Sequence, residues 1–490
     1  MKRYKIILCS LLLTLGLNAV EVEESVMMAK STAKVVHDPM IKNSIVKIFT
    51  VANKVDFEEP WSSHVEEFSG SGCIISGQRI LTNAHVVTDG TYVEVLKNGE
   101  TKRYEAEVLS IDHEADLALV KVKDKSFFEG TKSLDIGKLP ELQKEVNVYG
   151  FPMGGDTLSI TKGVVSRIEH QSYAHSNKML MAIQIDAAIN YGNSGGPALA
   201  DGKVIGLVMQ GNSYGEGMGY IIPASVINHY LEDMKDKKYD GYPYLGLQIQ
   251  DLESPVMKEM YGLKGKKYGV LVTKTIPNSP ASRVFKTGDI LISIDGNKVY
   301  SNYKVEFRKK EFTHFIYVID QHQLGDEVEF EILRDGKEKK FKILLDKKQN
   351  ELTLIKKREP ETKLSYYIYG GLVFVPGLSE YYLPSKFFNE YPDEKREELV
   401  VLKRVLSSSL TKGYGTYGLG VVDTINGKKF KNFKEFVQIL ENSSSKFVVF
   451  ADEDNYQMVV NREDVLKSQK EILEKYNIKD AMSDDLKEKK

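Results

Sequence analysis

The sequence contains little cysteine, and this scarcity limits how the protein can be stabilised and what it can bind. Of its two cysteines, Cys9 lies in an apolar N-terminal run, so a processed chain retains only Cys73. A single cysteine cannot form an intramolecular disulfide, a C-x-x-C redox motif or a thiolate zinc site. Cys73 precedes an apolar segment without an obvious activating partner, and we expect it to pack in the core.

Strong net charge and recognisable cofactor motifs are also missing. The 67 Lys and Arg nearly balance the 69 Asp and Glu, giving a formal net charge of -2. With no basic stripe either, the sequence predicts no nucleic-acid partner. It has no Walker loop, no dinucleotide fingerprint and no clustered metal ligands, so we expect neither a cofactor nor a metal site. The hydrophobic content of 42% is that of an ordinary globular protein, and excludes a wholly disordered chain.

Only the N-terminus has a long apolar run. Residues 1–19 begin with basic residues, continue with an apolar stretch at 6–17 and end in Ala19, which together predict a secretory signal peptide. A bilayer-spanning helix needs about 20 apolar residues, so we expect no permanent membrane span. The interpretation is export across a membrane, with a periplasmic location for the product.

The length of 490 residues predicts two to four domains. After a lead-in, many short strand-like runs follow one another without helices between them, which is typical of a β-barrel or sandwich. Two later units each mix strands with short helices, including an expected helical segment at 304–323, and their strings DILISIDGNKV and GVVDTINGKKF suggest two copies of one module. The expected division is a signal peptide at 1–19, a lead-in at 20–40, a β domain at 41–238, an α+β domain at 240–346, a linker at 347–365, a second α+β domain at 366–464 and a polar helical tail at 465–490.

Three short strings in the β domain carry the chemistry of amide hydrolysis. They are TNAHV, HEADLAL and GNSGGP, and they contain His85, Asp116 and Ser194 in that order. The reaction needs a hydroxyl nucleophile, a base that takes and returns its proton, and an acid that fixes the base's tautomer; chymotrypsin-like double barrels supply these groups in the same chain order. The spacing would place the first two residues in one barrel and the serine in the next.

The glycines around the serine suggest an oxyanion hole. Backbone N–H groups of Gly192 and Ser194 are the expected donors to the developing negative charge. Each string alone has an ordinary structural meaning, such as a turn aspartate or a flexible loop, but the three together in this order favour catalysis. His113, beside the proposed acid, lacks the strand-end context of His85, and we interpret it as outside the site.

The strings SGSGCIISGQRILTNAHVV, HEADLALVKV and QIDAAINYGNSGGPAL resemble the protease domain of the Deg/HtrA family, and the later units resemble its PDZ domains. The segments GGLVFVP and NGKKFKNFKEF are closest to the plant-type Deg branch. The resemblance implies a mainly β chain: a trypsin-like double β-barrel followed by two α+β PDZ domains. It further implies an ATP-independent serine endoprotease for unfolded or damaged proteins that assembles as a homo-trimer or hexamer.

The resemblance also assigns binding residues. Ala188, with Ile189 beside it, would lie at the base of the primary specificity pocket, which predicts cleavage after small or medium aliphatic residues. In the first PDZ domain, the loop that receives a peptide's C-terminal carboxylate would consist of Tyr244, Leu245, Gly246 and Leu247. In the second, the stretch that starts at Gly370 could form a groove or a purely structural contact between protomers.

Two alternatives remain open on the residues alone. The chain could be a non-enzymatic PDZ chaperone or scaffold with a vestigial barrel, although an intact set of catalytic strings disfavours this. It could equally be a regulatory protease that cuts one defined partner.

Overall fold

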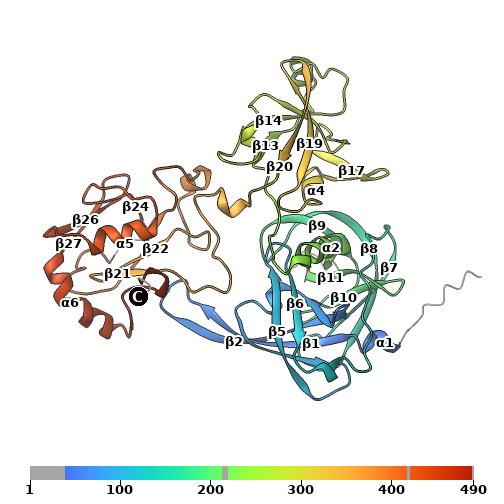
Figure 1. The fold of residues 1–490 in the computed structure, drawn as a ribbon, viewed down its shortest axis with the longest axis horizontal. Coiled ribbons are helices and arrows are strands. Elements are labelled where there is room, and N and C mark those ends of the chain that lie inside the picture. The colour runs from blue at the N-terminus through green and yellow to red at the C-terminus, as the bar shows by residue number, and fades with distance from the viewer. Residues whose placement is uncertain (1–38, 212–218, 416–419, 488–490) are drawn as a thin grey trace, which may run out of the picture. The chain divides into compact units, whose positions relative to one another are not determined.

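The computed structural model describes residues 39–211, 219–415 and 420–487 (Figure 1). The expected signal peptide and nearly all of the lead-in therefore lie outside the described residues. A short helix, α1 (Pro39–Lys42), precedes the first strand. Within the described ranges, no helix is long and apolar enough to cross a membrane.

Two closed six-stranded antiparallel barrels form the first part of the chain, as the sequence predicts. The first has the strand order β1-β2-β3-β6-β5-β4 and the second β10-β11-β12-β9-β8-β7. Helix α2 (Ala224–Asp233) follows the second barrel. The strands are β1 (Ile45–Val55), β2 (Ser63–Ile75), β3 (Arg79–Thr82), β4 (Gly90–Lys97), β5 (Arg103–Asp112), β6 (Leu117–Val122), β7 (Glu145–Gly150), β8 (Ser159–Ser172), β9 (Met179–Ile185), β10 (Pro197–Ala200), β11 (Lys203–Gly211) and β12 (Gly219–Pro223).

The barrel strands follow from alternating polarity. In β5, Tyr104 and Ala106 are buried, whereas Arg103, Glu105 and Glu107 are exposed, because successive side chains of a strand point to opposite faces. Closing each sheet into a barrel also leaves no unpaired edge strand. The two barrels thereby become rigid supports for the loops at their strand ends.

The first α+β unit contains a sheet in the order β13-β14-β15-β19-β20. Its closing hairpin turns at Asp335-Gly336, both with positive φ, as that dipeptide predicts. The elements are β13 (Leu247–Gln250), α3 (Pro255–Met260), β14 (Val270–Thr275), β15 (Ile290–Ile294), β16 (Asn297–Lys298), β17 (Lys304–Arg308), β18 (Glu311–His314), α4 (Ile316–Ile319), β19 (Glu327–Arg334) and β20 (Lys337–Leu344).

The helix expected at 304–323 is wrong for most of its length. Strands β17 and β18 form a hairpin there, and only the four residues of α4 are helical. Val305 and Thr313 pair across the hairpin and are both buried, while charged residues alternate with them. This period of two favours strands, and Lys310, with φ of 63°, makes the tight turn.

The second α+β unit has two small sheets, β21-β22-β23-β24 and β25-β26-β27. The tail expected to be a polar helix is helical only in α6, and Met482 beyond it pairs with Tyr367 of β21. The elements are β21 (Tyr367–Tyr369), β22 (Leu372–Pro376), β23 (Val400–Val405), β24 (Gly420–Val422), β25 (Thr424–Ile425), α5 (Phe433–Glu441), β26 (Phe447–Ala451), β27 (Gln457–Asn461) and α6 (Arg462–Lys475).

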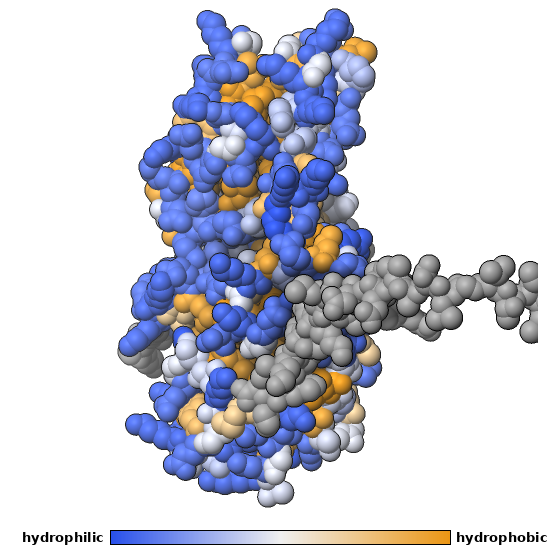
Figure 2. All heavy atoms as spheres, turned by 90° about the vertical axis from the view of Figure 1, so that its right-hand side faces the viewer, coloured by the Kyte–Doolittle hydropathy of each residue, from blue (hydrophilic) through white to orange (hydrophobic). Residues whose placement is uncertain are grey.

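Figure 2 shows one face of the molecule coloured by hydropathy. Hydrophilic residues cover most of that face, and apolar residues appear as separate patches. Scattered apolar residues of this kind are normal on soluble domains. We therefore look for function at the loops between the barrels.

Candidate active site

His85 and Asp116 come together at the ends of neighbouring strands. β3 ends at Thr82, and a single 3-10 turn (Ala84–Val86) presents His85, while Asp116 immediately precedes β6. The Nδ1 atom of His85 lies 2.8 Å from Oδ2 and 3.0 Å from Oδ1 of Asp116. The backbone N–H of His85 also donates to Oδ1, at 3.0 Å. The carboxylate is 1% exposed, and thus fixes both the imidazole and the turn that carries it.

The electrostatics suit a general base. Burial alone would lower the pKa of His85, but the charge of Asp116 and its hydrogen bond outweigh burial and raise that pKa above 6.5. A carboxylate can only accept, so Nδ1 carries the proton and Nε2 is left as the proton acceptor when the ring is neutral. This tautomer is the one that a serine nucleophile requires.

The loop that carries Ser194 is held from behind by Ser71. The Ser71 N–H donates to the Ser194 carbonyl at 2.8 Å, and the Ser71 hydroxyl donates to the Gly192 carbonyl at 2.7 Å. The N–H groups of Gly192 and Ser194 have no hydrogen-bond acceptor in the part of the chain that the structure describes. Paired, unoccupied N–H groups beside a nucleophile are what an oxyanion hole requires, so the assignment to these two residues stands as a prediction.

Glycine is required at two positions directly after Ser194. A Cβ on Gly195, whose φ is 79°, would lie 2.2 Å from the Ser71 carbonyl oxygen, and one on Gly196 would lie 2.1 Å from that of Tyr149. No larger residue fits without displacing backbone. The two glycines that end the string Gly-Asn-Ser-Gly-Gly are therefore dictated by close packing.

Ala188 and Ile189 shortly precede this loop in the chain. Ala188 is exposed, and its carbonyl accepts a hydrogen bond of 2.9 Å from the Thr161 hydroxyl. Ile189 packs against Gly219, where an added Cβ would lie 2.2 Å from the Ile189 Cδ1 atom. The surfaces that these residues present are small and apolar, which fits the predicted preference; their role in specificity stays a prediction.

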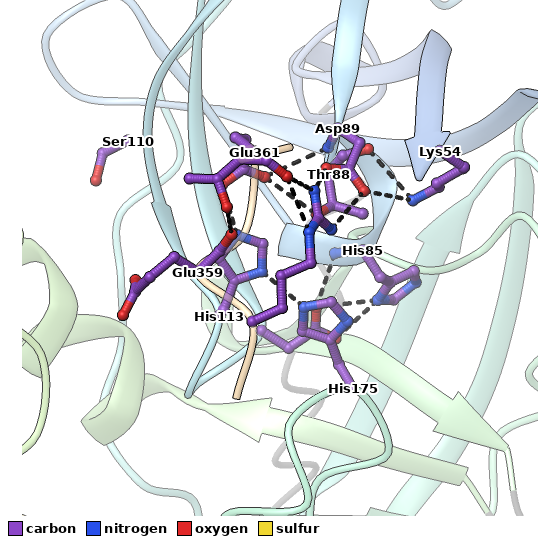
Figure 3. Close-up of polar contacts among 12 residues, drawn as sticks. Lys54, His85, Thr88, Asp89, Ser110, His113, His175, Glu359 and Glu361 are labelled. Carbon is purple, nitrogen blue, oxygen red and sulfur yellow. Dashed lines mark hydrogen bonds and ion pairs between the residues drawn. The ribbon is translucent and has the colours of Figure 1, made fainter. Parts of the chain in front are cut away.

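Three residues near His85 escaped the sequence reasoning. His113 Nδ1 lies 2.9 Å from His175 Nε2, and His113 Nε2 lies 3.2 Å from Glu361 Oε2 (Figure 3). The ring of His175 is tilted against that of His85, with centroids 6.2 Å apart. These hydrogen bonds connect His113 to the surroundings of His85, whereas the sequence had indicated no connection. The three residues come from distant parts of the sequence and follow no motif.

A buried acid precedes the proposed catalytic one. Asp112 is 0% exposed, and its Oδ1 accepts hydrogen bonds from the Tyr239 hydroxyl and from the Ala115 N–H. Burial raises the pKa of Asp112 to about 7 in spite of these bonds. The unfolded chain ionises this group near 3.8, so the folded chain binds more protons between these two values.

The Asp112→Asn chain is accordingly expected to lose the pH dependence that this group creates. In the wild type, the contribution of Asp112 to stability falls as pH rises from about 4 to about 7, whereas asparagine cannot ionise. The variant should have a higher thermal midpoint than the wild type at pH 8, and a smaller difference at pH 5, by circular dichroism. If the difference in thermal midpoint between variant and wild type were the same at pH 5 and pH 8, the raised pKa of Asp112 would be contradicted.

The stretch 244–247 of the first PDZ-like unit is the predicted carboxylate loop. Gly246 has a φ of 73°, and its carbonyl accepts from the Ile276 N–H at 2.9 Å. The N–H groups of Leu245 and Gly246 have no acceptor among the described residues. β13, which begins at Leu247, pairs with β14 on one side only, so its other edge is available to an added peptide strand. The N–H of Tyr244, by contrast, donates to the backbone carbonyl of Lys347, at 2.7 Å.

The corresponding place in the second unit is filled by the chain itself. The Gly370 N–H donates to Gln469 Oε1 at 2.7 Å, and Gln469 Nε2 donates to the Ile368 carbonyl at 2.7 Å. β22 pairs with β21 on one side and β23 on the other, so it has no free edge. This geometry disfavours a peptide groove at Gly370 and gives the loop a contact within the chain, whereas the sequence had offered a contact between protomers.

A free peptide carboxylate is therefore expected to be recognised by the first unit. A fluorescent peptide with an aliphatic C-terminus should bind at least about tenfold more tightly than its C-terminal amide, because charge-assisted hydrogen bonds are worth about 1.5–3 kcal/mol. Gly246→Ala should abolish this preference in fluorescence anisotropy, and Gly371→Ala should leave it intact. Equal binding of acid and amide would contradict the assignment.

Metal-ligating and thiol side chains can be compared only in the part of the chain that the structure describes. Among the described residues, no group of three or more His, Cys, Asp or Glu side chains could hold a metal ion. Cys73 is buried, and burial raises the pKa of its thiol to about 12. The thiolate, which is the reactive form, is therefore negligible near neutral pH.

Comparison with known proteins extends these observations. A trypsin-like peptidase domain matches residues 70–207, and PDZ domains match residues 243–345 and 355–485. "Protease Do-like 2, chloroplastic" of Arabidopsis thaliana is 38% identical over 468 residues, covering 92% of this chain and 76% of that protein. "Protease Do-like 4, mitochondrial" of the same plant is 35% identical over 441 residues, covering 90% and 84%. The structure of "HtrA-type protease AlgW with tripeptide" has a TM-score of 0.50 at 21% identity, and the match covers 62% of this chain and 94% of that one.

These comparisons correct one prediction. The periplasmic location expected from the N-terminus is wrong, because the relatives that match most of the chain are named as chloroplastic or mitochondrial proteins. Their names point to an organelle. The N-terminal segment that carried the prediction lies outside the described residues, and a basic, apolar N-terminus alone did not distinguish the destinations.

Proposed function

Because the chain belongs to the Deg/HtrA family of serine proteases, we propose that it hydrolyses unfolded or damaged proteins without ATP, through Ser194, His85 and Asp116. That it is a serine endopeptidase follows from its family. The proposal concerns which residues perform the reaction and on what substrates.

The observation that carries the proposal is the contact between His85 and Asp116. The buried carboxylate lies within 3.0 Å of Nδ1 through both of its oxygens, and also accepts the backbone N–H of His85. An aspartate held in this way stabilises the imidazolium that forms when the base takes a proton. A structural histidine would have no need of two such contacts.

In the proposed reaction, His85 Nε2 takes the hydroxyl proton of Ser194 as its oxygen attacks the scissile carbonyl. The N–H groups of Gly192 and Ser194 then donate to the oxyanion of the tetrahedral intermediate. His85 gives its proton to the leaving amine, and an acyl group remains on Ser194. A water molecule, deprotonated by the same histidine, releases the acid and restores the serine.

Substrate selection is proposed to involve two places. The small apolar surface formed by Ala188 and Ile189 would accept aliphatic side chains before the cleaved bond, and the loop at Leu245 and Gly246 would hold a C-terminal carboxylate. The AlgW structure is named as containing a tripeptide, which supports peptide binding for this chain by likeness. Assembly into homo-trimers or hexamers is likewise proposed from the family resemblance.

The test is the hydrolysis of casein by the full chain without ATP, followed by mass spectrometry of the products. The proposal expects cleavage, with small or medium aliphatic residues at the new C-termini. Product ends dominated by Lys or Arg would overturn the assigned pocket. The absence of cleavage, even with added C-terminal peptides, would contradict the proposed activity and favour a PDZ scaffold.

A further inference from the structure

The segment between the two PDZ-like units lies against the loops that surround His85. We call residues 356–362 the strap. Lys357 donates through its Nζ to the Ser176 carbonyl, next to His175. Arg358 donates to Asp89 at 2.9 Å, and their side chains are only 12% and 8% exposed. Glu361 accepts from the Thr88 hydroxyl at 3.2 Å and from the Asp89 N–H at 3.3 Å.

These contacts involve three segments that flank the catalytic base. Thr88 and Asp89 follow the turn that carries His85, and His113 precedes the proposed acid. His175 lies on the loop between β8 and β9, with its ring against that of His85 (Figure 3). The ion pair of Arg358 with Asp89 is almost fully buried. Moving the strap away would leave a buried charge without its partner, which is unfavourable in free energy. The strap is therefore fixed in place.

Within the strap, Glu361 begins a chain of hydrogen bonds that ends at His175. Burial would raise the pKa of Glu361, but its hydrogen bonds with His113, the Asp89 N–H and the Thr88 hydroxyl lower it below its usual value. As a carboxylate, Glu361 can only accept, so His113 donates through Nε2. When the His113 ring is neutral, its Nδ1 accepts from the Nε2–H of His175, at 2.9 Å.

We propose that Glu361 is a positioning residue for the protease: through His113 it holds the His175 ring against that of His85, and so sets how efficiently the catalytic base works. This inference rests on the proposed role of His85.

The charge state of His175 explains why such positioning matters. Burial lowers the pKa of His175 to about 4, so the ring is neutral near pH 7. The titratable groups that face it are Asp116, His113, His85 and Lys54. A second imidazolium at this position would oppose the positive charge that His85 acquires during the reaction. A neutral His175 ring, whose Nε2–H donates to His113, can pack against His85 without electrostatic repulsion of the His85 imidazolium.

The test compares Glu361→Gln with Glu359→Gln in the full chain, using fluorescein-labelled casein. Both variants remove one negative charge from the strap, but the Glu359 side chain bonds Asn350 rather than the protease domain. Glu361→Gln is expected to lower kcat about tenfold with little change in KM, since misplacing a catalytic group by about 1 Å can cost up to ~100-fold. Glu359→Gln is expected to match the wild type in both constants.

A second variant keeps the inference testable if Glu361→Gln does not fold. His113→Gln places an amide nitrogen near the original Nε2 and can still meet Glu361, but it lacks the Nδ1 contact with His175. His113→Gln should lower kcat to a similar degree. The double variant, Glu361→Gln with His113→Gln, should have a kcat only slightly lower than either single variant, because both substitutions interrupt the same series of hydrogen bonds.

The inference would be overturned if the kcat of Glu361→Gln and His113→Gln stayed within about twofold of the wild-type value, because misplacing the catalytic base lowers kcat by more than this. It would also be overturned if kcat fell equally in Glu359→Gln. Thermal midpoints by circular dichroism identify variants that have simply unfolded. An inactive wild-type chain would instead overturn the proposed function, and this inference with it, so the two failures are distinguishable.

Discussion

The Ser194→Ala chain is expected to hydrolyse casein with a kcat about 10⁶-fold lower than that of the wild type, the scale of loss when a nucleophilic serine is removed from a triad. The alanine lacks the hydroxyl from which His85 would take a proton, so no acyl group can form. Residual hydrolysis by the remaining site would be close to the background. The measurement is the release of acid-soluble fluorescence from labelled casein.

The matched control for this variant is Ser126→Ala. Ser126 is exposed, and its hydroxyl contacts only Asp124 at the start of a short 3-10 turn. This variant should retain wild-type activity. If Ser194→Ala kept more than a few percent of the wild-type rate, the nucleophile would have to be another residue.

The Asp116→Asn chain is expected to lose about 10⁴-fold in kcat while keeping its fold. An asparagine amide can donate to Nδ1, and so favours the tautomer in which Nε2 carries the proton and cannot take one from Ser194. Asp112→Asn is the matched control, since the Asp112 carboxyl bonds Tyr239 and the Ala115 N–H rather than His85. It should stay active, and similar losses in both variants would contradict the assigned roles.

The pH dependence of kcat/KM offers a further check on Asp116. Because this residue raises the pKa of His85 above 6.5, wild-type activity should fall as pH decreases through a value above 6.5. In Asp116→Asn, burial acts without the opposing charge, so the residual activity should persist to lower pH. If kcat/KM decreased at the same pH in the wild type and in Asp116→Asn, a group other than His85 would control the pH dependence.

The barrels could be predicted from local patterns, and the candidate triad, which stays a prediction, comes from three short strings. Alternating burial in strands such as β5 is visible in the sequence, and so is the order of His85, Asp116 and Ser194. The close packing behind Ser194 also leaves a visible mark, since Gly195 and Gly196 tolerate no Cβ. Each of these features is visible in a short stretch of the sequence.

Features that depend on tertiary contacts could not be predicted in this way. The hairpin at 304–314 appeared helical because its charged residues obscure the period of two, and its register depends on the burial of Val305 and Thr313. The filling of the Gly370 loop requires Gln469, which lies far along the chain. Similarly, nothing near His113 indicates that Glu361 would contact it.

Covalent labelling of the full chain by a fluorophosphonate, with peptide mass mapping of the product, tests the central claim most directly. Such a reagent modifies a serine whose hydroxyl is activated by a neighbouring base. We predict a single adduct on Ser194 in the wild type, and none at that position in the His85→Ala chain. An adduct on a different serine, or labelling of Ser194 that persists without His85, would contradict the assignment of His85 as the base that activates Ser194.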